Sequence, residues 1–213
     1  MKLNTKDLIL YAVTDRSWLR GKTLAEQVEK ALQGGVTMIQ LREKELGEED
    51  FYREALEIRD LCRRYGVPFL INDNVMLAKR VDADGVHVGQ SDLEAGKVRE
   101  ILGPDKIIGV TAKTVEQAKK AEAMGADYLG SGAIFGTTTK KDAKPMTMEL
   151  LREITDSVDI PVVAIGGITA ENIAGLAGSG VVGAAVVSGI FAAEDITAAS
   201  MKLKKILQEQ VVE

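Results

Sequence analysis

Pro161-Val-Val-Ala-Ile165 is the stretch that indicates the fold, because it is apolar throughout and no longer than a strand. Runs of this kind are typical of a parallel sheet that is covered on both faces. Further strand-length runs recur along the chain, which makes eight in all. The runs are Leu8 to Thr14, Met38 to Arg42, Pro68 to Asn72, Gly85 to Gly89, Lys106 to Thr111, Tyr128 to Gly132, Val162 to Gly166 and Ala184 to Ser188.

Longer amphipathic segments alternate with these runs and read as helices. They include Thr23 to Gln33, Glu48 to Arg64, Thr114 to Met124, Met148 to Val158 and Ala198 to Gln210. Strands that alternate with helices require parallel pairing with right-handed crossovers. Eight such units in 213 residues, with no linker between them, predict an α/β fold, a single-domain (β/α)8 TIM barrel over residues 1–213.

An open doubly wound sheet is the alternative fold, and it most often carries Gly-x-Gly-x-x-Gly after its first strand. The chain has one match, Gly178-Ser-Gly180-Val-Val-Gly183. It precedes a strand and opens no helix, so we interpret it as a helix-to-strand turn and favour the barrel. Two threonines, Thr114 and Thr169, are predicted to be helix N-caps.

The composition excludes several classes of function. A net charge of -5 argues against a nucleic-acid surface, which needs a concentrated positive face. No apolar run approaches the ~18 residues that span a bilayer, and the first residues lack the apolar core of a signal peptide. We therefore expect no membrane partner and a cytoplasmic location. Cys62 is the single cysteine and is expected to be a buried or half-buried thiol.

Polar side chains alternate at the end of the second strand run, Gln40-Leu-Arg-Glu-Lys44. Gln40, Arg42 and Lys44 share one face, which in a barrel points inward at the end where active sites lie. Burying an arginine there without a partner would cost several kcal/mol. The partner of Arg42 is expected to be an anionic or hydrogen-bonding ligand, or a carboxylate such as Asp73. A purely structural ion pair stays open.

Two carboxylates follow the next two strand runs, in Asn72-Asp73 and Gln90-Ser-Asp92. Mg²⁺ prefers oxygen ligands, and two carboxylates could hold it together with substrate oxygens and water. Asp73 and Asp92 are therefore the predicted metal ligands. Either aspartate could instead be a helix N-cap, and Asp92, just before Leu93 and a helical run, fits that role well.

Glycine-rich turns follow the seventh and eighth runs, where barrels often bind phosphate. Gly166-Gly167-Ile-Thr and Val187-Ser188-Gly189 let backbone amides approach an anion without a Cβ in the way. We expect a monophosphate there, although tight turns alone would also need these glycines.

The loop after the sixth run, residues 136–141, combines three threonines with two lysines. Such a loop is suited to closing over a pyrophosphate and excluding water. Lys140 is predicted to contact the ligand directly, whereas Lys141 and Lys144 are expected to be surface charges. An ordinary solvated loop would have a similar composition.

In order and spacing these motifs resemble those of the thiamine-phosphate synthase family along nearly the whole chain, from Tyr11-Ala-Val-Thr-Asp15 to Val187-Ser188. Each motif is weak alone. They are Gln40-Leu-Arg-Glu-Lys44, Ile71-Asn-Asp73, His87-Val-Gly-Gln-Ser-Asp92, Gly109-Val-Thr111, Phe135-Gly-Thr-Thr-Thr-Lys140, Ile165-Gly-Gly-Ile168 and Val187-Ser188.

The resemblance implies a transferase of thiamine biosynthesis. The family joins 4-amino-2-methyl-5-hydroxymethylpyrimidine diphosphate to 4-methyl-5-(2-hydroxyethyl)thiazole phosphate, or its carboxylated form, and releases pyrophosphate with Mg²⁺. By resemblance, the pyrimidine diphosphate site is Gln40, Arg42, Lys44, Asn72, Thr111 and Lys140, and the metal ligands are Asp73 and Asp92. The thiazole phosphate site is Thr137, Thr139, Gly167, Val187 and Ser188. Lys140, Lys44 and Arg42 would stabilise charge on the leaving group in a dissociative substitution.

The chain departs from the family pattern at three positions. The family usually has proline where Gly136 stands, and commonly serine and histidine in place of Thr111 and Lys113. Thr111 keeps a hydroxyl, while Gly136 is expected to loosen its loop and Lys113 to add a charge at the mouth. His87, the only histidine, is expected to be a structural residue with satisfied hydrogen bonds.

Three other functions stay open. A thiazole tautomerase would bind the same thiazole phosphate but needs a placed acid-base group. An aldolase would form a Schiff base on Lys44 or Lys113. A sensor would bind thiamine phosphates without turnover. The sequence also leaves open whether the chain forms a homo-oligomer.

Overall fold

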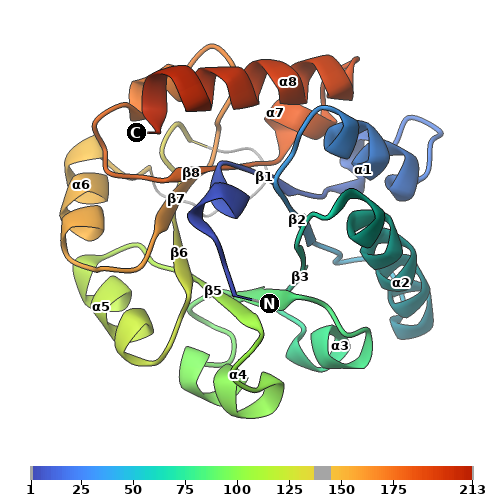
Figure 1. Ribbon diagram of the computed structural model, residues 1–213, viewed down its shortest axis with the longest axis horizontal. Coiled ribbons are helices and arrows are strands. Elements are labelled where there is room, and N and C mark those ends of the chain that lie inside the picture. The colour runs from blue at the N-terminus through green and yellow to red at the C-terminus, as the bar shows by residue number, and fades with distance from the viewer. Residues whose placement is uncertain (1, 137–144, 213) are drawn as a thin grey trace.

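Eight parallel strands close into a barrel in sequence order (Figure 1) in the computed structural model, which describes residues 2–136 and 145–212. The strands are β1 (Leu10–Val13), β2 (Met38–Leu41), β3 (Phe69–Asn72), β4 (Gly85–Val88), β5 (Ile107–Thr111), β6 (Tyr128–Gly132), β7 (Val162–Ile165) and β8 (Gly183–Val186). Each strand lies within two residues of its predicted run at either end. The predicted strands and the (β/α)8 barrel are therefore confirmed.

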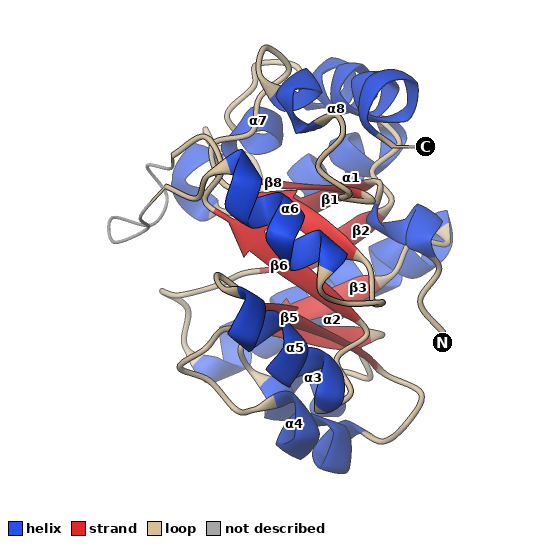
Figure 2. Ribbon diagram, turned by 90° about the vertical axis from the view of Figure 1, so that its left-hand side faces the viewer, coloured by secondary structure: helices blue, strands red, loops and turns tan. Residues whose placement is uncertain are grey.

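Helices surround the barrel and cover its outer face (Figure 2). They are α1 (Leu24–Gln33), α2 (Glu48–Tyr65), α3 (Val75–Arg80), α4 (Ala95–Leu102), α5 (Val115–Ala123), α6 (Met148–Asp156), α7 (Ser188–Phe191) and α8 (Ile196–Ile206). Short 3₁₀ turns form η1 (Thr5–Leu8), η2 (Arg16–Trp18) and η3 (Ile173–Leu176), and a π turn, η4 (Leu207–Val211), follows α8. The five helices named from the sequence are all present.

One of the two predicted N-caps is correct. The Thr114 hydroxyl accepts a hydrogen bond from the amide of Gln117 at 3.2 Å and begins α5. Thr169 begins no helix, because Asn172 closes a tight turn around it. The side chain of Asn172 accepts from the amide of Thr169 at 2.8 Å and donates to the carbonyl of Gly167 at 2.8 Å. The helix expected after β7 is only the 3₁₀ turn η3, whose N-cap is Asn172.

Side chains of the strands divide between two hydrophobic layers. Ile39 and Leu41 of β2 belong to the layer between barrel and helices, whereas Met38 belongs to a smaller cluster that includes Tyr11 and Tyr128. Alternate residues of a strand point to opposite faces. The inward direction predicted for Gln40 is thus confirmed, and its side chain is buried against Tyr11.

Glycines matter at two places in the barrel, of which only the turn before β8 was predicted from the sequence. Residues 178–183 connect η3 to β8, with Gly178 and Gly180 at φ values of 68° and 78°, so the helix-to-strand turn is confirmed. Gly109 of β5 makes room inside the barrel, because a Cβ there would lie 2.1 Å from the ring of Tyr128. The ring of Tyr128 on β6 therefore fits only because the neighbouring residue on β5 is a glycine.

No helix formed by the described residues combines the length and the apolar character that crossing a membrane requires. Cys62 is a free, buried cysteine on α2, as expected. Burial, reinforced by nearby Asp84, raises the pKa of the Cys62 thiol well above its usual range.

Candidate active site

A cavity of about 620 Å³ opens at the C-terminal ends of the strands. Ten of the predicted site residues line it: Gln40, Arg42, Lys44, Asn72, Asp73, Asp92, Thr111, Gly167, Val187 and Ser188. Thr137, Thr139 and Lys140 lie outside the described residues. Residues from six strand ends therefore meet in one cavity, as active-site residues of a barrel do.

Lys44 and the two candidate metal ligands form a charged cluster on the cavity wall. The ammonium group of Lys44 lies 2.8 Å from Oδ2 of Asp73. Burial opposes ionisation of Asp73, but hydrogen bonds from Lys44 and Asp92 outweigh it and hold its pKa below the usual value. Burial and the neighbouring Asp73 carboxylate raise the pKa of Asp92. A hydrogen bond from the Gly89 amide lowers this pKa, but by less than the other two effects together. Two such carboxylates repel each other unless a proton or a cation lies between them.

The backbone fixes where both aspartates point. Asp73 has a left-handed φ of 62°, and its amide donates to the carbonyl of His87 at 2.8 Å. Oδ2 of Asp92 accepts from the amide of Gly89 at 2.7 Å. The N-cap of α4 is Glu94, so the alternative that Asp92 caps this helix is wrong.

Asp73 and Asp92 can supply only some of the oxygen ligands that Mg²⁺ needs. Within residues 2–136 and 145–212, no group of three or more His, Cys, Asp or Glu side chains could hold a metal ion. Mg²⁺ commonly takes one or two carboxylates and completes its shell with substrate phosphates and water. The pair Asp73 and Asp92 matches that donor set.

Arg42 pairs with a carboxylate, which was one of the expected alternatives, but the partner is Asp15 and not Asp73. Its Nη1 lies 3.6 Å from Oδ2 of Asp15, which follows β1. Asp73 is instead the partner of Lys44. The strand ends explain the correction, because β2 pairs with both β1 and β3 and each neighbour supplies one carboxylate to one cation.

A chain of hydrogen bonds through Tyr128 links residues of the cavity wall. Gln40 Nε2 donates to the hydroxyl of Tyr11, whose oxygen lies 2.8 Å from that of Tyr128. Nδ1 of His87 lies 2.9 Å from the Tyr128 hydroxyl, and its Nε2 lies 2.9 Å from Oγ1 of Thr111. Burial raises the pKa of both tyrosines, so they stay protonated and able to donate.

His87 therefore has satisfied hydrogen bonds, as expected, although it also lines the cavity. Sequence reasoning missed Tyr11, which lines the cavity, and Tyr128, whose hydroxyl is hydrogen-bonded to that of Tyr11. Their signal was available: each is a polar-tipped aromatic residue in a strand run that is otherwise apolar or small. A buried tyrosine hydroxyl needs a hydrogen-bond partner, which points to other polar groups inside the barrel.

The model of the family described as thiamine monophosphate synthase matches residues 10–190 of this chain. The chain belongs to this family.

Relatives of the family match over nearly their whole length. The thiamine-phosphate synthase of Ruminiclostridium cellulolyticum is 50% identical over 200 residues, which cover 94% of this chain and 95% of the relative. That of Clostridium botulinum is 50% identical over 202 residues, with 95% of each chain covered. The solved thiamine phosphate pyrophosphorylase from Pyrococcus furiosus is 42% identical, with a TM-score of 0.88 over 96% of this chain and 98% of that structure.

The fold is shared more widely than the family. A solved 3-hexulose-6-phosphate synthase has a TM-score of 0.68 at 17% identity, over 93% of this chain and 99% of that structure. At such low identity the likeness concerns the barrel alone, and barrels host many reactions. Membership of the thiamine monophosphate synthase family therefore rests on the sequence matches.

The turn after β7 differs in backbone from an ordinary loop. Gly166 and Gly167 have φ values of 100° and 66°, and a Cβ on Gly167 would lie 2.1 Å from the carbonyl oxygen of Gly136. The amide of Phe135 also donates to the carbonyl of Gly166 at 3.0 Å. The loops after β6 and β7 are thus in direct contact, and glycine is required at the contact.

Gly136, one of the departures from the thiamine monophosphate synthase pattern, has a φ of 75°. Proline is restricted to φ near −65°, so a proline at this position would need a different backbone. Of the other two departures, Thr111 joins the hydrogen-bond chain through His87, and Lys113 lines the cavity.

Proposed function

We infer that this chain is a transferase that forms thiamine phosphate. The observation that carries the inference is the cluster of Lys44, Asp73 and Asp92, which three neighbouring strand ends bring to one cavity in a member of the thiamine monophosphate synthase family. An ammonium group and two carboxylates suit a metal-bound diphosphate.

Each substrate is assigned to one side of the cavity. The pyrimidine diphosphate would bind Gln40, Arg42, Lys44, Asn72 and Thr111, with Lys140 from the loop after β6. The phosphate of the thiazole would bind Gly167, Val187 and Ser188, with Thr137 and Thr139 from that same loop. This arrangement is supported by the fact that the described residues of both sets line one cavity.

Mg²⁺ would be held by Asp73 and Asp92 together with diphosphate oxygens. When bound, it supplies charge neutralisation at the leaving pyrophosphate. Burial and the neighbouring Asp73 carboxylate raise the pKa of Asp92, and a cation held between the two carboxylates would relieve their repulsion. The ammonium group of Lys44 remains beside Asp73 and can turn to a diphosphate oxygen.

The reaction needs little acid-base help from the protein. The bond between the methylene carbon and the diphosphate oxygen breaks with its electron pair on oxygen, and the aminopyrimidine stabilises the cation that remains. The thiazole nitrogen then forms the new bond to that carbon. Arg42, Lys44 and Lys140 would stabilise the departing charge, an effect that commonly contributes several kcal/mol.

The alternative of a tautomerase receives no support from the geometry. A proton shift needs a group that is poised to take and return a proton. Both ring nitrogens of His87 are instead engaged, by Tyr128 and Thr111.

The proposal is tested with purified protein, both substrates and MgCl2. Equal amounts of thiamine phosphate and pyrophosphate are expected, measured by chromatography and a coupled pyrophosphate assay. Each substrate alone is the control and should give neither product. If saturating substrates give no thiamine phosphate, the inferred reaction is wrong.

A further inference from the structure

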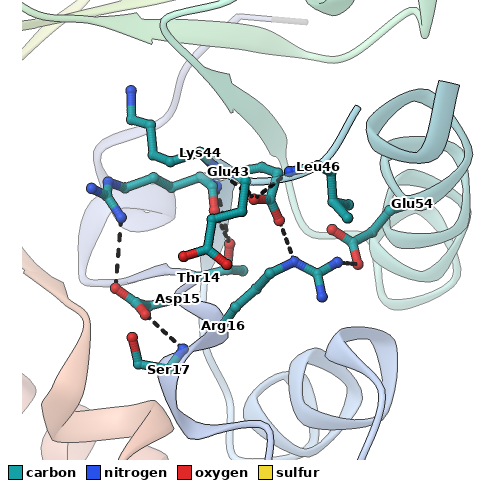
Figure 3. A network of polar contacts seen from close by, with 10 residues as sticks. Thr14, Asp15, Arg16, Ser17, Glu43, Lys44, Leu46 and Glu54 are labelled. Atoms are coloured by element: carbon teal, nitrogen blue, oxygen red, sulfur yellow. Dashed lines mark hydrogen bonds and ion pairs between the residues drawn. The ribbon is translucent and has the colours of Figure 1, made fainter. Parts of the chain in front are cut away.

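The loop after β1 holds the loop after β2 through three consecutive residues (Figure 3). The hydroxyl of Thr14 accepts from the amide of Arg42 at 3.0 Å and lies 3.3 Å from its carbonyl oxygen. Asp15 pairs with the Arg42 side chain, and Arg16 pairs with Glu43. Backbone and side chains of the second loop are therefore fixed from the first.

Glu43 is the centre of these contacts. Its side chain is only 2% exposed, although it is charged. One carboxylate oxygen accepts from the amides of Lys44 and Glu45 at 2.7 Å each and from that of Leu46 at 3.3 Å. The other oxygen accepts from Nε of Arg16. A single carboxylate thus organises the turn that carries Lys44 out of β2.

Glu54 of α2 completes the cluster. Arg16 lies between Glu43 and Glu54 and bonds to both (Figure 3). The second oxygen of Glu54 is buried with no hydrogen-bond partner, and burial raises the pKa of this carboxyl. Buried ion pairs contribute little net stability, and an unpaired polar atom costs free energy. Stability alone therefore explains this cluster poorly.

The cluster lies beside the cavity without being part of it. Arg42 and Lys44, the two residues flanking Glu43, line the cavity, whereas Arg16, Glu43 and Glu54 are absent from its wall as far as the described residues form it. Glu43 thus lies outside the cavity wall while both of its neighbours line the cavity, so anchoring Glu43 constrains where Arg42 and Lys44 lie.

We propose that Glu43, held by Arg16 and Glu54, is a positioning residue that fixes Arg42 and Lys44 for the diphosphate of the pyrimidine substrate. The proposal rests on the function inferred above. Glu43 touches no substrate in this arrangement and acts through its two neighbours. Misplacing both cations should weaken diphosphate binding and charge stabilisation, and should leave the thiazole phosphate site after β7 and β8, which Glu43 does not contact, unchanged.

The test compares Glu43→Gln with wild type. Glutamine keeps an oxygen for the turn amides but loses the charge that Arg16 pairs with. We expect KM for the pyrimidine diphosphate to rise on the order of tenfold or more. The KM for thiazole phosphate should stay within a factor of about two, as for a substrate whose contacts are unchanged. Calorimetry with inorganic pyrophosphate and MgCl2 should show the same loss without turnover.

Two further variants separate positioning from folding. Arg16→Lys keeps a cation beside Glu43 and should restore most of the pyrophosphate affinity that Arg16→Ala loses. Glu100→Gln is the matched control, because Glu100 pairs with Lys97 on the exposed face of α4, and it should match wild type. The positioning role is wrong if Glu43→Gln lowers only the melting temperature and leaves both KM values and the pyrophosphate affinity unchanged. If Glu43→Gln does not fold, Arg16→Ala is judged by the same criterion. A wild-type protein without turnover would instead overturn the inferred reaction.

Discussion

Asp73 combines three constraints at the scale of a single residue. Its backbone is left-handed, its carboxylate pairs with Lys44, and the neighbouring Asp92 helps to lower its pKa. Left-handed backbone costs of order 1–3 kcal/mol at a non-glycine residue, and aspartate tolerates it better than most. The hydrogen bond from its amide to His87 holds this conformation. The carboxylate is therefore aimed by the main chain.

Replacing either carboxylate of this pair should weaken the dependence on Mg²⁺. Asp73→Asn and Asp92→Asn each remove one charged oxygen ligand while keeping the shape of the side chain. We expect the Mg²⁺ concentration for half-maximal activity to rise on the order of tenfold in each variant. The effect is limited because the other aspartate and the substrate oxygens still bind the ion. Asp159→Asn, an exposed change in the loop before β7, is the control. Titration curves that coincide with wild type would place the ion elsewhere.

Lys140 is predicted to act from the loop after β6, outside the described residues. Lys140→Ala should lower turnover by about tenfold or more, equivalent to ~1.4 kcal/mol in the barrier. Lys141→Ala is the matched control, because the neighbouring lysine is expected to be a surface charge. Steady-state kinetics of both variants decide the matter. Equal kinetics for Lys140→Ala and wild type would remove this lysine from the mechanism.

At the scale of elements, strands and helices follow from local pattern, whereas their cross-connections do not. The unbroken run at Pro161 and the alternation at Gln40 correctly predicted strands and the inward face. A carboxylate was among the partners expected for Arg42, but it is Asp15 and not the suggested Asp73, because which of two neighbouring strands supplies the partner depends on loop conformation. The short helix expected at Thr169 failed for a similar reason, since Asn172 folds back on the turn. Contacts of these two kinds depend on how the loops fold once the barrel has closed, which a local sequence pattern does not reveal.

The clusters around Glu43 and Tyr128 were missed for the same physical reason. Both depend on side chains from different elements, as in the contacts of Arg16 with Glu54 and of Tyr11 with Tyr128. The sequence reveals that a buried hydroxyl or carboxylate needs a partner, but it does not say which one. Only ten of the thirteen predicted site residues can be placed, because the other three lie in residues 137–144.

Gly109 shows how one element limits another. A Cβ at this position would overlap the ring of Tyr128, so Gly109→Ala must displace the ring or the strand. Overpacking of this kind typically costs ~1–3 kcal/mol, and we expect the free energy of unfolding to fall by that amount in urea titrations. Gly96→Ala is the matched control, because its Cβ would meet nothing closer than 4.0 Å in α4. It should be neutral or slightly stabilising, and equal losses in the two variants would contradict the steric explanation.

At the scale of the whole molecule, the barrel places acidic protons in two separate apolar layers. Cys62 is buried between barrel and helices, and Tyr11 and Tyr128 are buried inside the barrel. Burial raises the pKa of all three groups above the values of the unfolded chain. Above those unfolded values the unfolded chain loses protons that the folded protein keeps, so folding stability must fall as pH rises.

We therefore expect the free energy of unfolding to decrease above pH ~8.5, where an unfolded thiol ionises, and more steeply above pH ~10, where tyrosines follow. Each group contributes at most ~1.4 kcal/mol per pH unit. Cys62→Ala removes the thiol, at the cost of a small cavity at all pH values. The difference between wild type and variant should therefore shrink as pH rises through this range. Urea unfolding at several pH values measures this difference in the free energy of unfolding. A difference that does not change with pH would show that the Cys62 thiol ionises as readily in the folded protein as in the unfolded chain.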